Sequence, residues 1–305
     1  MSLGVKDKVI VITGAGRGIG RAIALLGANE GARVVVNDLG GTPNGSGADA
    51  APAEQVAAEI RATGGEAVAN GDNIAAAGGG ERIIQTALDV FGRVDCVINN
   101  AGILRDRMFH NMTPEEWRDV IDVHLNGYFN VSRAAAPHFK SQNSGSFVHF
   151  TSPAGLIGAM GQSNYAAAKM GVVGLSTGIA FDMARFNVRS NCVAPSAWTR
   201  LLSGLTARNK EEEERFARLE KSMSPEKIAP LCVFLATDAA AGISGQIFKA
   251  RGNEIFLMSQ PRPIRSVHRD GGWSLQSLEE QMLPAMKSSF VKMENHLDVF
   301  SWEPI

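Results

Sequence analysis

The sequence predicts an α/β protein: one open, doubly wound parallel sheet with helices on both faces. Short β-branched runs alternate along the chain with longer amphipathic stretches, as they do in successive strand–helix–strand units. A glycine-rich turn follows the first of these strands and opens the first helix, which is the arrangement of sheets that bind dinucleotides. The chain shows no repeat at a fixed period, so a repeat architecture is excluded.

The expected elements follow one another in regular order. Buried strands are expected at 9–12, 34–36, 94–99, 146–150 and 188–193, with another strand before Asp72 and a sheet edge at 246–248. Amphipathic helices are expected at 18–29, 52–63, 81–91, 115–139 and 163–186. We assign residues 1–250 to this sheet domain, and we expect residues 251–305 to form a C-terminal extension packed on the same domain or on a neighbouring subunit.

Two segments interrupt this order. Residues 39–52 form a long Gly-rich loop after the second expected strand, and residues 196–225 lie where a mobile lid would sit. Within the second segment, Lys210 to Glu214 form a run of charges in a helical pattern, which we interpret as a solvated face.

The extension is too apolar for a solvated tail. Four of its side chains recur at helical spacing and would form one apolar stripe: Leu275, Leu278, Met282 and Met286. Such a stripe must bury against something. The sequence leaves two places open for it: a cover over part of the substrate cleft, or a brace on the sheet or on a neighbouring subunit.

Composition and charge narrow the classes of function. The 305 residues are 45% hydrophobic and 20% charged, as in an ordinary soluble globular protein. The 30 basic and 31 acidic residues give a formal charge of -1, so the charge balance does not favour nucleic acid as a partner. No apolar run approaches the roughly 20 residues needed to cross a bilayer, so no membrane partner is expected.

The cysteines and histidines argue against disulfide and metal chemistry. Cys96, Cys192 and Cys232 are scattered, odd in number and outside any C-x-x-C pair, so neither a disulfide framework nor a zinc site is expected. The six histidines show no metal-binding spacing, and we expect no bound metal. This cysteine usage is typical of a reduced chain, and we expect a cytoplasmic protein.

The turn after the first strand is the candidate phosphate-binding loop. It reads Thr-Gly-Ala-Gly-Arg-Gly-Ile-Gly at 13–20, and the residues expected to hold the cofactor are Gly14, Gly16, Arg17, Gly18, Ile19 and Gly20. Glycines let the backbone approach a pyrophosphate closely, and the helix N-terminus then offers free N–H groups and a positive dipole end. Because the turn lies between a strand and a helix, it indicates a Rossmann-type sheet.

The end of the second strand discriminates between the two nicotinamide dinucleotides. Asp38 lies where a carboxylate accepts hydrogen bonds from the adenosine ribose hydroxyls and repels the extra phosphate of NADP. Arg17 is an opposing indication, since a basic side chain in the loop would meet that phosphate. Leu39 stands where an NADP enzyme would often carry another basic residue, so we expect NAD as the cofactor.

Tyr165 and Lys169 form a candidate proton-transfer pair. They are four positions apart on one expected helix, so their side chains project from the same face. A tyrosine with an ordinary pKa near ~10 is a poor base at neutral pH, but a neighbouring ammonium and a bound nicotinamide cation would lower that pKa. Tyr165 would then exchange a proton with the substrate oxygen, which Ser152 would hold from the carboxyl end of an expected strand.

Together these motifs resemble the short-chain dehydrogenase/reductase family over about residues 5–250. The turn matches the family's T-G-x-x-x-G-x-G, and Tyr165 and Lys169 match its Y-x-x-x-K. The resemblance implies four catalytic residues: Asn126, Ser152, Tyr165 and Lys169. Asn126 would order a proton-relay water, and Lys169 would also bind the nicotinamide ribose. The further cofactor contacts that the resemblance implies are Asp72, Asn73, Asn100, Ala101, Gly102, Tyr165 and Pro195.

The finer resemblance is to the (3R)-hydroxyacyl-CoA dehydrogenase domain of peroxisomal multifunctional enzyme type 2. The segments that carry it are 35–41, 100–107, 161–165 and 194–195. It implies an NAD-dependent oxidoreductase that interconverts a secondary alcohol and a ketone, with a 3-hydroxyacyl-CoA as the implied substrate. Two alternatives stay open: a dehydrogenase for steroids or other hydrophobic alcohols, and a non-catalytic dinucleotide-sensing protein on the same fold.

Two further features bear on substrate and assembly. The cluster Arg105-Asp106-Arg107 would suit an anionic CoA, although a solvated surface cluster is the favoured interpretation. Related enzymes pair the helices expected here at 115–139 and 163–186 across a two-fold axis. Alanines at 134–136 and 166–168 would allow such an approach, or equally would pack the helices on their own sheet. We expect a homodimer or homotetramer.

Overall fold

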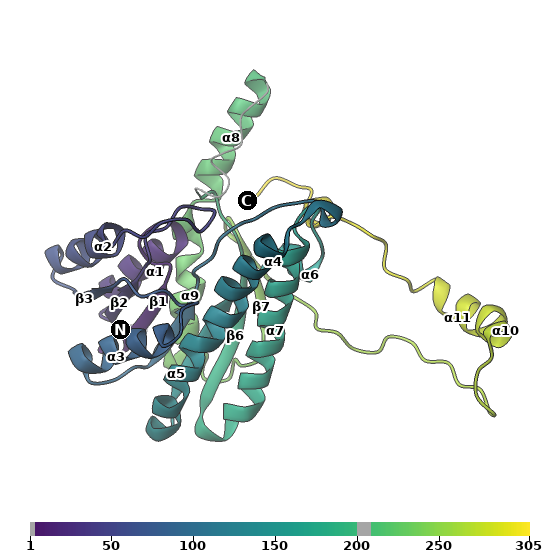
Figure 1. Ribbon diagram of the computed structural model, residues 1–305, viewed down its shortest axis with the longest axis horizontal. Coiled ribbons are helices and arrows are strands. Elements are labelled where there is room, and N and C mark those ends of the chain that lie inside the picture. The colour runs from purple at the N-terminus through teal and green to yellow at the C-terminus, as the bar shows by residue number, and fades with distance from the viewer. Residues whose placement is uncertain (1–3, 200–208) are drawn as a thin grey trace.

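The computed structural model describes residues 4–199 and 209–305 (Figure 1). Within these residues one sheet of eight strands has the order β3-β2-β1-β4-β5-β6-β7-β8. The strands are β1 (Val9–Thr13), β2 (Arg33–Asn37), β3 (Glu66–Asn70), β4 (Cys96–Asn99), β5 (Gly145–Phe150), β6 (Val188–Ser196), β7 (Ile247–Arg251) and β8 (Glu254–Leu257). Neighbouring strands are parallel except β7 and β8, which are antiparallel. The predicted doubly wound α/β fold is confirmed.

Helices cover both faces of the sheet. They are α1 (Gly18–Asn29), α2 (Ala51–Ala62), α3 (Gly79–Phe91), α4 (Pro114–Ile121), α5 (Gly127–Gln142), α6 (Pro153–Leu156), α7 (Ser163–Met183), α8 (Lys210–Ser222), α9 (Ala229–Ala236), α10 (Leu275–Ser277), α11 (Leu283–Lys287) and α12 (His296–Val299). Helix α1 contacts α2 and α9 on one face, and α5 contacts α3 and α7 on the other. The central strands are therefore buried on both faces, which is why β1 and β2 are nearly continuous apolar runs.

The helix expected at 115–139 forms as one helical run with a π segment inside it. Helix α4 leads into the π segment η2 (Asp122–Asn126), and α5 continues from Gly127. Thr113 caps the start of α4, because its hydroxyl accepts from Glu116 N and the Glu116 carboxylate accepts from Thr113 N. A π segment changes the direction of the side chains within it, and it is often found at functional sites.

The extension begins and ends on the sheet domain. Its first strand, β8, pairs with β7, so the sheet runs past the expected boundary at residue 250. The last residues return to the same edge, where the rings of Phe256, Phe300 and Trp302 pack with centroids 5.3–6.2 Å apart. The backbone N–H of Asn253 also donates to the carbonyl of Ile305 (2.7 Å).

The middle of the extension, residues 259–293, forms an arm that projects from the body (Figure 1). The arm contains the helical turns α10, η6 (Leu278–Met282) and α11. The predicted helical stripe therefore exists: Leu275 is 88% exposed, whereas Leu278, Met282 and Met286 are half-buried. The chain does not fold its own arm over the cleft, because a loop on either side carries the arm outwards.

The charge run lies on a solvated helix, as expected. Helix α8 has no buried residue, and Asn209 caps its start by accepting a hydrogen bond from Glu212 N. Acidic residues fill its first turn, where they complement the positive end of the helix dipole. Part of the expected lid at 196–225 lies at 200–208, outside the described residues.

Candidate active site

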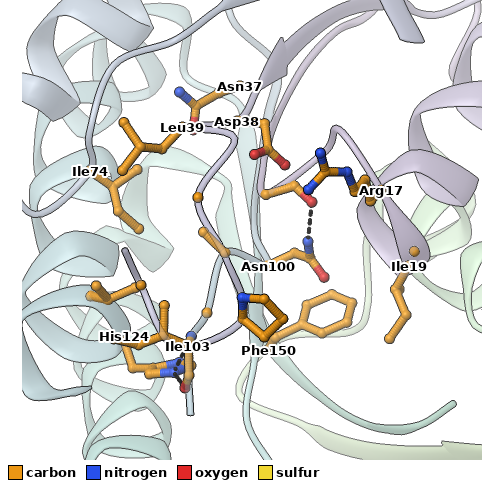
Figure 2. A pocket seen from close by; sticks show the side chains of 18 of the residues that line it. Arg17, Ile19, Asn37, Asp38, Leu39, Ile74, Asn100, Ile103, His124 and Phe150 are labelled. Atoms are coloured by element: carbon orange, nitrogen blue, oxygen red, sulfur yellow. Dashed lines mark hydrogen bonds between the residues drawn. The ribbon is translucent and has the colours of Figure 1, made fainter. Parts of the chain in front are cut away.

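An open cavity of about 310 Å³ lies at the carboxyl edge of the sheet. Its walls are the residues that follow the strands: Gly14 after β1, Asp38 after β2, Asp72 after β3, Asn100 after β4 and Thr151 after β5. Figure 2 shows Arg17, Asp38 and Leu39 in the same cavity as His124 and Phe150. This is the edge at which open α/β sheets bind their ligands.

The turn at 13–20 is packed so closely that glycine is required in it. A Cβ on Gly14 would lie 2.7 Å from the Cα of Ala101, and Gly14 also has a positive φ of 65°. The side chain of Asn100 donates to the carbonyls of Thr13 and Gly14 (both 2.9 Å), which ties the turn to the end of β4. Backbone from two strands thus forms one continuous wall of the cavity.

The glycines of the turn divide into two groups. Gly14, Arg17, Gly18 and Ile19 line the cavity, as expected for cofactor contacts. Gly16 and Gly20 are not among the lining residues: Gly16 N donates to Asp38 Oδ2 (2.8 Å), and a Cβ on Gly20 would clash with Gly14 O. These two glycines therefore serve the packing of the turn itself: Gly16 faces the Asp38 carboxylate, and Gly20 faces the backbone of Gly14.

Two backbone N–H groups orient the carboxylate of Asp38. Its Oδ2 accepts from Gly16 N, and its Oδ1 accepts from Gly40 N (2.6 Å). Each carboxylate oxygen has two lone pairs, so both retain acceptor capacity toward the cavity. Asp38 is thereby held at the mouth of the loop expected to bind phosphate, beside Leu39.

The end of β3 contributes a second acidic group. Asp72 and Asn73 both line the cavity. The Asp72 carboxylate accepts from Arg82 Nε (2.5 Å) and Asn70 Nδ2 (2.9 Å), so it is oriented by two partners. Ala101 and Gly102 line the same cavity, and so does Pro195 at the end of β6.

Tyr165 and Lys169 lie together on α7 and both line the cavity. Lys169 is 3% exposed, and its Nζ donates to Phe150 O (2.6 Å) and Tyr128 Oη (3.2 Å). Ser152 is buried at the start of α6, where its Oγ accepts from Ala154 N (3.1 Å). Tyr165, Lys169 and Ser152 are thus gathered at the carboxyl ends of β5 and β6.

Burial dominates the protonation of this pair. It raises the pKa of Tyr165 to about 12, an effect that the neighbouring Ser152 hydroxyl opposes. It also lowers the pKa of Lys169 to about 7. The protein alone does not produce the lowered tyrosine pKa expected from the sequence, since the Lys169 amine bonds to Phe150 and Tyr128 rather than to Tyr165.

The structure does not support the assignment of Asn126. This residue is exposed, and its Nδ2 donates to Asp122 Oδ1 (2.7 Å) within the π segment. His124 lies at the site instead, 2% exposed, with its ring edge-on to Tyr165 at 5.1 Å between centroids. Its Nε2 lies 3.1 Å from Ile103 N and 2.8 Å from Ile103 O.

Helical spacing would have identified the correct face. His124, Tyr128, Val131 and Ala135 are three or four residues apart and are all buried, whereas Asn126 lies between them on the opposite side. The family motif pointed to Asn126, which is exposed and lies two positions after the buried His124. Sequence reasoning also missed Tyr128, whose Oη donates to Ala101 O (3.0 Å).

The two arginines of the cluster that would suit CoA are already paired with carboxylates. Arg105 contacts Asp119 (3.0 Å) and Arg107 contacts Glu116 (2.7 Å). Asp106 accepts from Gln162 Nε2 (2.9 Å). The favoured interpretation of this cluster, a solvated surface network, agrees with these contacts.

The described residues contain neither a metal-binding cluster nor a membrane-spanning helix. Across residues 4–199 and 209–305, no three or more His, Cys, Asp or Glu side chains are grouped as a metal site would require. None of the helices in these ranges combines the length and the apolar character of a membrane span.

Comparison with known proteins decides the family. Residues 8–210, more than half of the chain, match the family model described as short chain dehydrogenase. The chain belongs to the short-chain dehydrogenase family. It is an oxidoreductase acting on CH–OH groups, as the sequence predicts. The cavity at the carboxyl edge of the sheet is the candidate site for its nucleotide and substrate.

Relatives of this short-chain dehydrogenase agree with the finer resemblance. It is 50% identical to a putative short-chain type dehydrogenase/reductase of Mycobacterium tuberculosis, over 78% of this chain and 80% of that one. It is 40% identical to mouse peroxisomal multifunctional enzyme type 2 over 86% of this chain, but spans only 34% of that enzyme. A hydroxyacyl-CoA dehydrogenase of Mycobacterium tuberculosis is 37% identical, covering 88% of this chain and 84% of that one.

A solved structure resembles this short-chain dehydrogenase over nearly its whole length. It is a short chain dehydrogenase from Mycobacterium avium, 37% identical in sequence, with a TM-score of 0.80. The match covers 93% of this chain and 95% of that chain, so it takes in most of the C-terminal extension as well as the sheet domain.

Proposed function

We propose that this short-chain dehydrogenase is an NAD-dependent 3-hydroxyacyl-CoA dehydrogenase. The observation that carries the proposal is that a single cavity is lined both by Asp38, after β2, and by Tyr165 and Lys169, on α7. A dinucleotide extended between them would have its adenosine ribose at the carboxylate and its nicotinamide at the tyrosine. The name of the Mycobacterium tuberculosis relative and the motifs shared with multifunctional enzyme type 2 support the acyl-CoA substrate.

The residues around the cavity fit the proposed cofactor. The turn at 13–20 and the start of α1 would hold the pyrophosphate, because their N–H groups and the helix dipole favour anions. Asp72 and Asn73 would lie by the adenine, while Asn100, Ala101, Gly102 and Pro195 would line the nicotinamide half. When bound, the nicotinamide supplies the acceptor or donor of the hydride.

The residues of α6 and α7 would carry the proton chemistry. In alcohol oxidation, Tyr165 would remove the hydroxyl proton, and Ser152 would hold the same oxygen by a hydrogen bond. Lys169, when charged, would favour the phenolate of Tyr165. Its pKa of about 7 makes that charge sensitive to its neighbours at physiological pH.

The substrate proposal is tested by NADH formation with a panel of secondary alcohols. The panel includes short and long 3-hydroxyacyl-CoAs and several hydroxysteroids. We expect kcat/KM to be highest for a 3-hydroxyacyl-CoA. Higher kcat/KM for steroids would favour the hydrophobic-alcohol alternative, and tight NAD binding without turnover of any alcohol would favour a dinucleotide sensor.

Cofactor choice gives a first quantitative prediction. Replacing Asp38 with alanine should narrow the preference for NAD over NADP by at least tenfold, because the carboxylate that repels the extra phosphate is lost. Calorimetric titration of both dinucleotides measures the preference. Glu66→Ala, which removes an exposed carboxylate at the start of β3, is the matched control and should leave the preference unchanged. Equal affinity of the wild type for NAD and NADP would contradict the assignment.

We further propose that the protein is a homo-oligomer, a dimer or a tetramer. Large apolar side chains are exposed on α5 and α7, namely Phe129 (50%), Met170 (43%) and Phe181 (80%). Such surface is costly in water, and a closed two-fold contact between these helices would bury it. We expect light scattering to give a multiple of the 32.4 kDa chain mass at micromolar concentration. A monomer mass throughout that range would refute the proposal.

A cytoplasmic location is proposed from thiol chemistry. The three cysteines are free and buried, and burial raises the pKa of the Cys96 thiol to about 11, so it remains protonated and unreactive. Microscopy of the tagged full-length protein, or cell fractionation, tests the location.

A further inference from the structure

Both tyrosines of the chain lie against Lys169. Sequence composition gives only two tyrosines, Tyr128 and Tyr165. The Lys169 Nζ lies 4.8 Å from the ring centroid of Tyr128 and 5.6 Å from that of Tyr165. It also donates a hydrogen bond to Tyr128 Oη (3.2 Å), whereas its other acceptor is the carbonyl of Phe150. The catalytic role proposed above uses Tyr165 and leaves Tyr128 unexplained.

The hydroxyl of Tyr128 has a defined direction. It donates its proton to Ala101 O (3.0 Å), so its lone pairs are left to accept from Lys169. Ala101 lines the cavity next to Asn100 and Gly102. Tyr128 therefore joins the lysine to the loop that follows β4, through two hydrogen bonds in sequence.

Among the residues that the structure describes, the charged form of Lys169 is stabilised by hydrogen bonds to uncharged acceptors and not by a carboxylate. None of the ion pairs found in the described part of the chain includes this lysine. Within the described residues, its Nζ donates hydrogen bonds to Phe150 O and Tyr128 Oη. A hydrogen bond from a charged donor favours the charged form, so the Tyr128 hydroxyl stabilises the ammonium.

The other titratable groups around Lys169 stay neutral near pH 7. They are His124 from η2, His149 from β5, Cys192 from β6, and Tyr128 and Tyr165. Burial lowers the pKa of both histidines, and the charge of Lys169 lowers it further. Burial raises the pKa of Cys192 to about 12, and it raises the pKa of Tyr128 well above its ordinary value. Lys169 is the group of this cluster that titrates near neutrality.

We propose that Tyr128 is a positioning residue that holds the Lys169 ammonium in its charged form between the loop after β4 and Tyr165. It does not itself exchange protons with a substrate, because its hydroxyl is engaged by Ala101 O and Lys169 Nζ and Tyr128 is not among the residues that line the cavity. The consequence for turnover rests on the proposed function, in which Tyr165 is the base. The effect on Lys169 itself does not rest on that function.

The variant Tyr128→Phe tests the proposal, since it removes the hydroxyl and keeps the ring. Loss of the acceptor should lower the pKa of Lys169 by about one unit, a shift typical of a hydrogen bond to a charged group. With less positive charge beside it, the Tyr165 phenolate forms less readily. The acid limb of the pH profile for alcohol oxidation should therefore move to higher pH by up to about one unit, while NAD binding persists.

Ser132→Ala is the matched control. Ser132 is also buried on α5, and its hydroxyl accepts from Asn99 Nδ2 (3.0 Å) without touching Lys169. We expect this variant to lose stability and to keep the wild-type pH profile. A profile of Tyr128→Phe that coincides with that of the wild type, or an equal shift in Ser132→Ala, would overturn the proposal.

Fluorine NMR gives a second measurement that needs neither activity nor a Tyr128 variant. Uniform 3-fluorotyrosine labelling places two signals in the protein, and Tyr165→Phe identifies which belongs to Tyr128. The Tyr128 signal should shift with pH as Lys169 titrates, and Lys169→Met should abolish that shift. A pH-dependent signal in a wild type that oxidises no alcohol would support Tyr128 and refute the proposed function. A Tyr128 signal that is flat through the neutral range would refute the role of Tyr128.

Discussion

Replacing Tyr165 with phenylalanine should lower kcat for alcohol oxidation by about 100- to 10,000-fold, the range typical of a general acid–base group. The substitution removes only the hydroxyl. The ring keeps its edge-on contact with His124 (5.1 Å between centroids) and its place near Lys169, so the fold and NAD binding should persist. Steady-state NADH formation measures the loss, and calorimetry and circular dichroism check the rest.

Thr177→Ala provides the control for that variant. Thr177 lies on the same helix, α7, and its hydroxyl bonds to Val173 O (2.9 Å), away from the cavity. Its removal should leave kcat close to the wild-type value. If Tyr165→Phe retains more than a tenth of wild-type turnover, another group moves the proton and the mechanism proposed here is wrong.

Placing glutamates on the arm should weaken the assembly of the proposed oligomer. Leu275, Val291 and Met293 are 88%, 87% and 96% exposed, which is unusual for side chains of this size. If the arm packs on a second copy in addition to the α5–α7 contact proposed above, three buried charges would weaken the assembly. The triple variant Leu275→Glu, Val291→Glu, Met293→Glu should then run at a lower mass than the wild type in light scattering.

The matched control introduces the same charge at exposed polar positions of the arm: Gln276→Glu, Gln281→Glu and Ser288→Glu. This variant should keep the wild-type mass. Assembly that survives the first variant would leave the arm as a cover over the cleft of a neighbouring subunit, which predicts an altered substrate preference in the alcohol panel instead. If the triple arm variant is unchanged in mass, thermal stability and substrate preference, the arm is neither a cover over a cleft nor a brace on the sheet or on a neighbouring subunit.

Local pattern predicted the sheet well, because its central strands are buried on both faces. The runs at Val9–Thr13 and Arg33–Asn37 are apolar for that reason, and their spacing from the amphipathic helices indicates parallel connections. The glycine-rich turn was also predictable, since the backbone at position 14 packs so closely on Ala101 that only glycine fits there. Asp38, Tyr165 and Lys169 follow from the same logic of strand ends and helical spacing.

Local pattern was less informative for the helical run 114–142 and for the extension. A motif match favoured Asn126, but the π segment and the packing of α5 put His124 and Tyr128 on the buried side. The apolar stripe at 275–286 was recognised, but its place in the projecting arm depends on where β8 and the returning C-terminus contact the sheet domain. That place is not encoded in a short window of sequence, whereas helical spacing does indicate the buried side of the run at 114–142.

The sequence by itself determined the fold class, the dinucleotide turn, the Asp38 carboxylate and the Tyr165–Lys169 pair, because each depends on neighbours a few residues away or on the end of one strand. Only the tertiary structure decided which polar groups surround Lys169. That amine lies on α7, while its acceptors come from β5 and α5, elements that the sheet brings together from distant parts of the chain. The protonation of Tyr165 and Lys169 is governed by this burial, which no spacing in the sequence reveals.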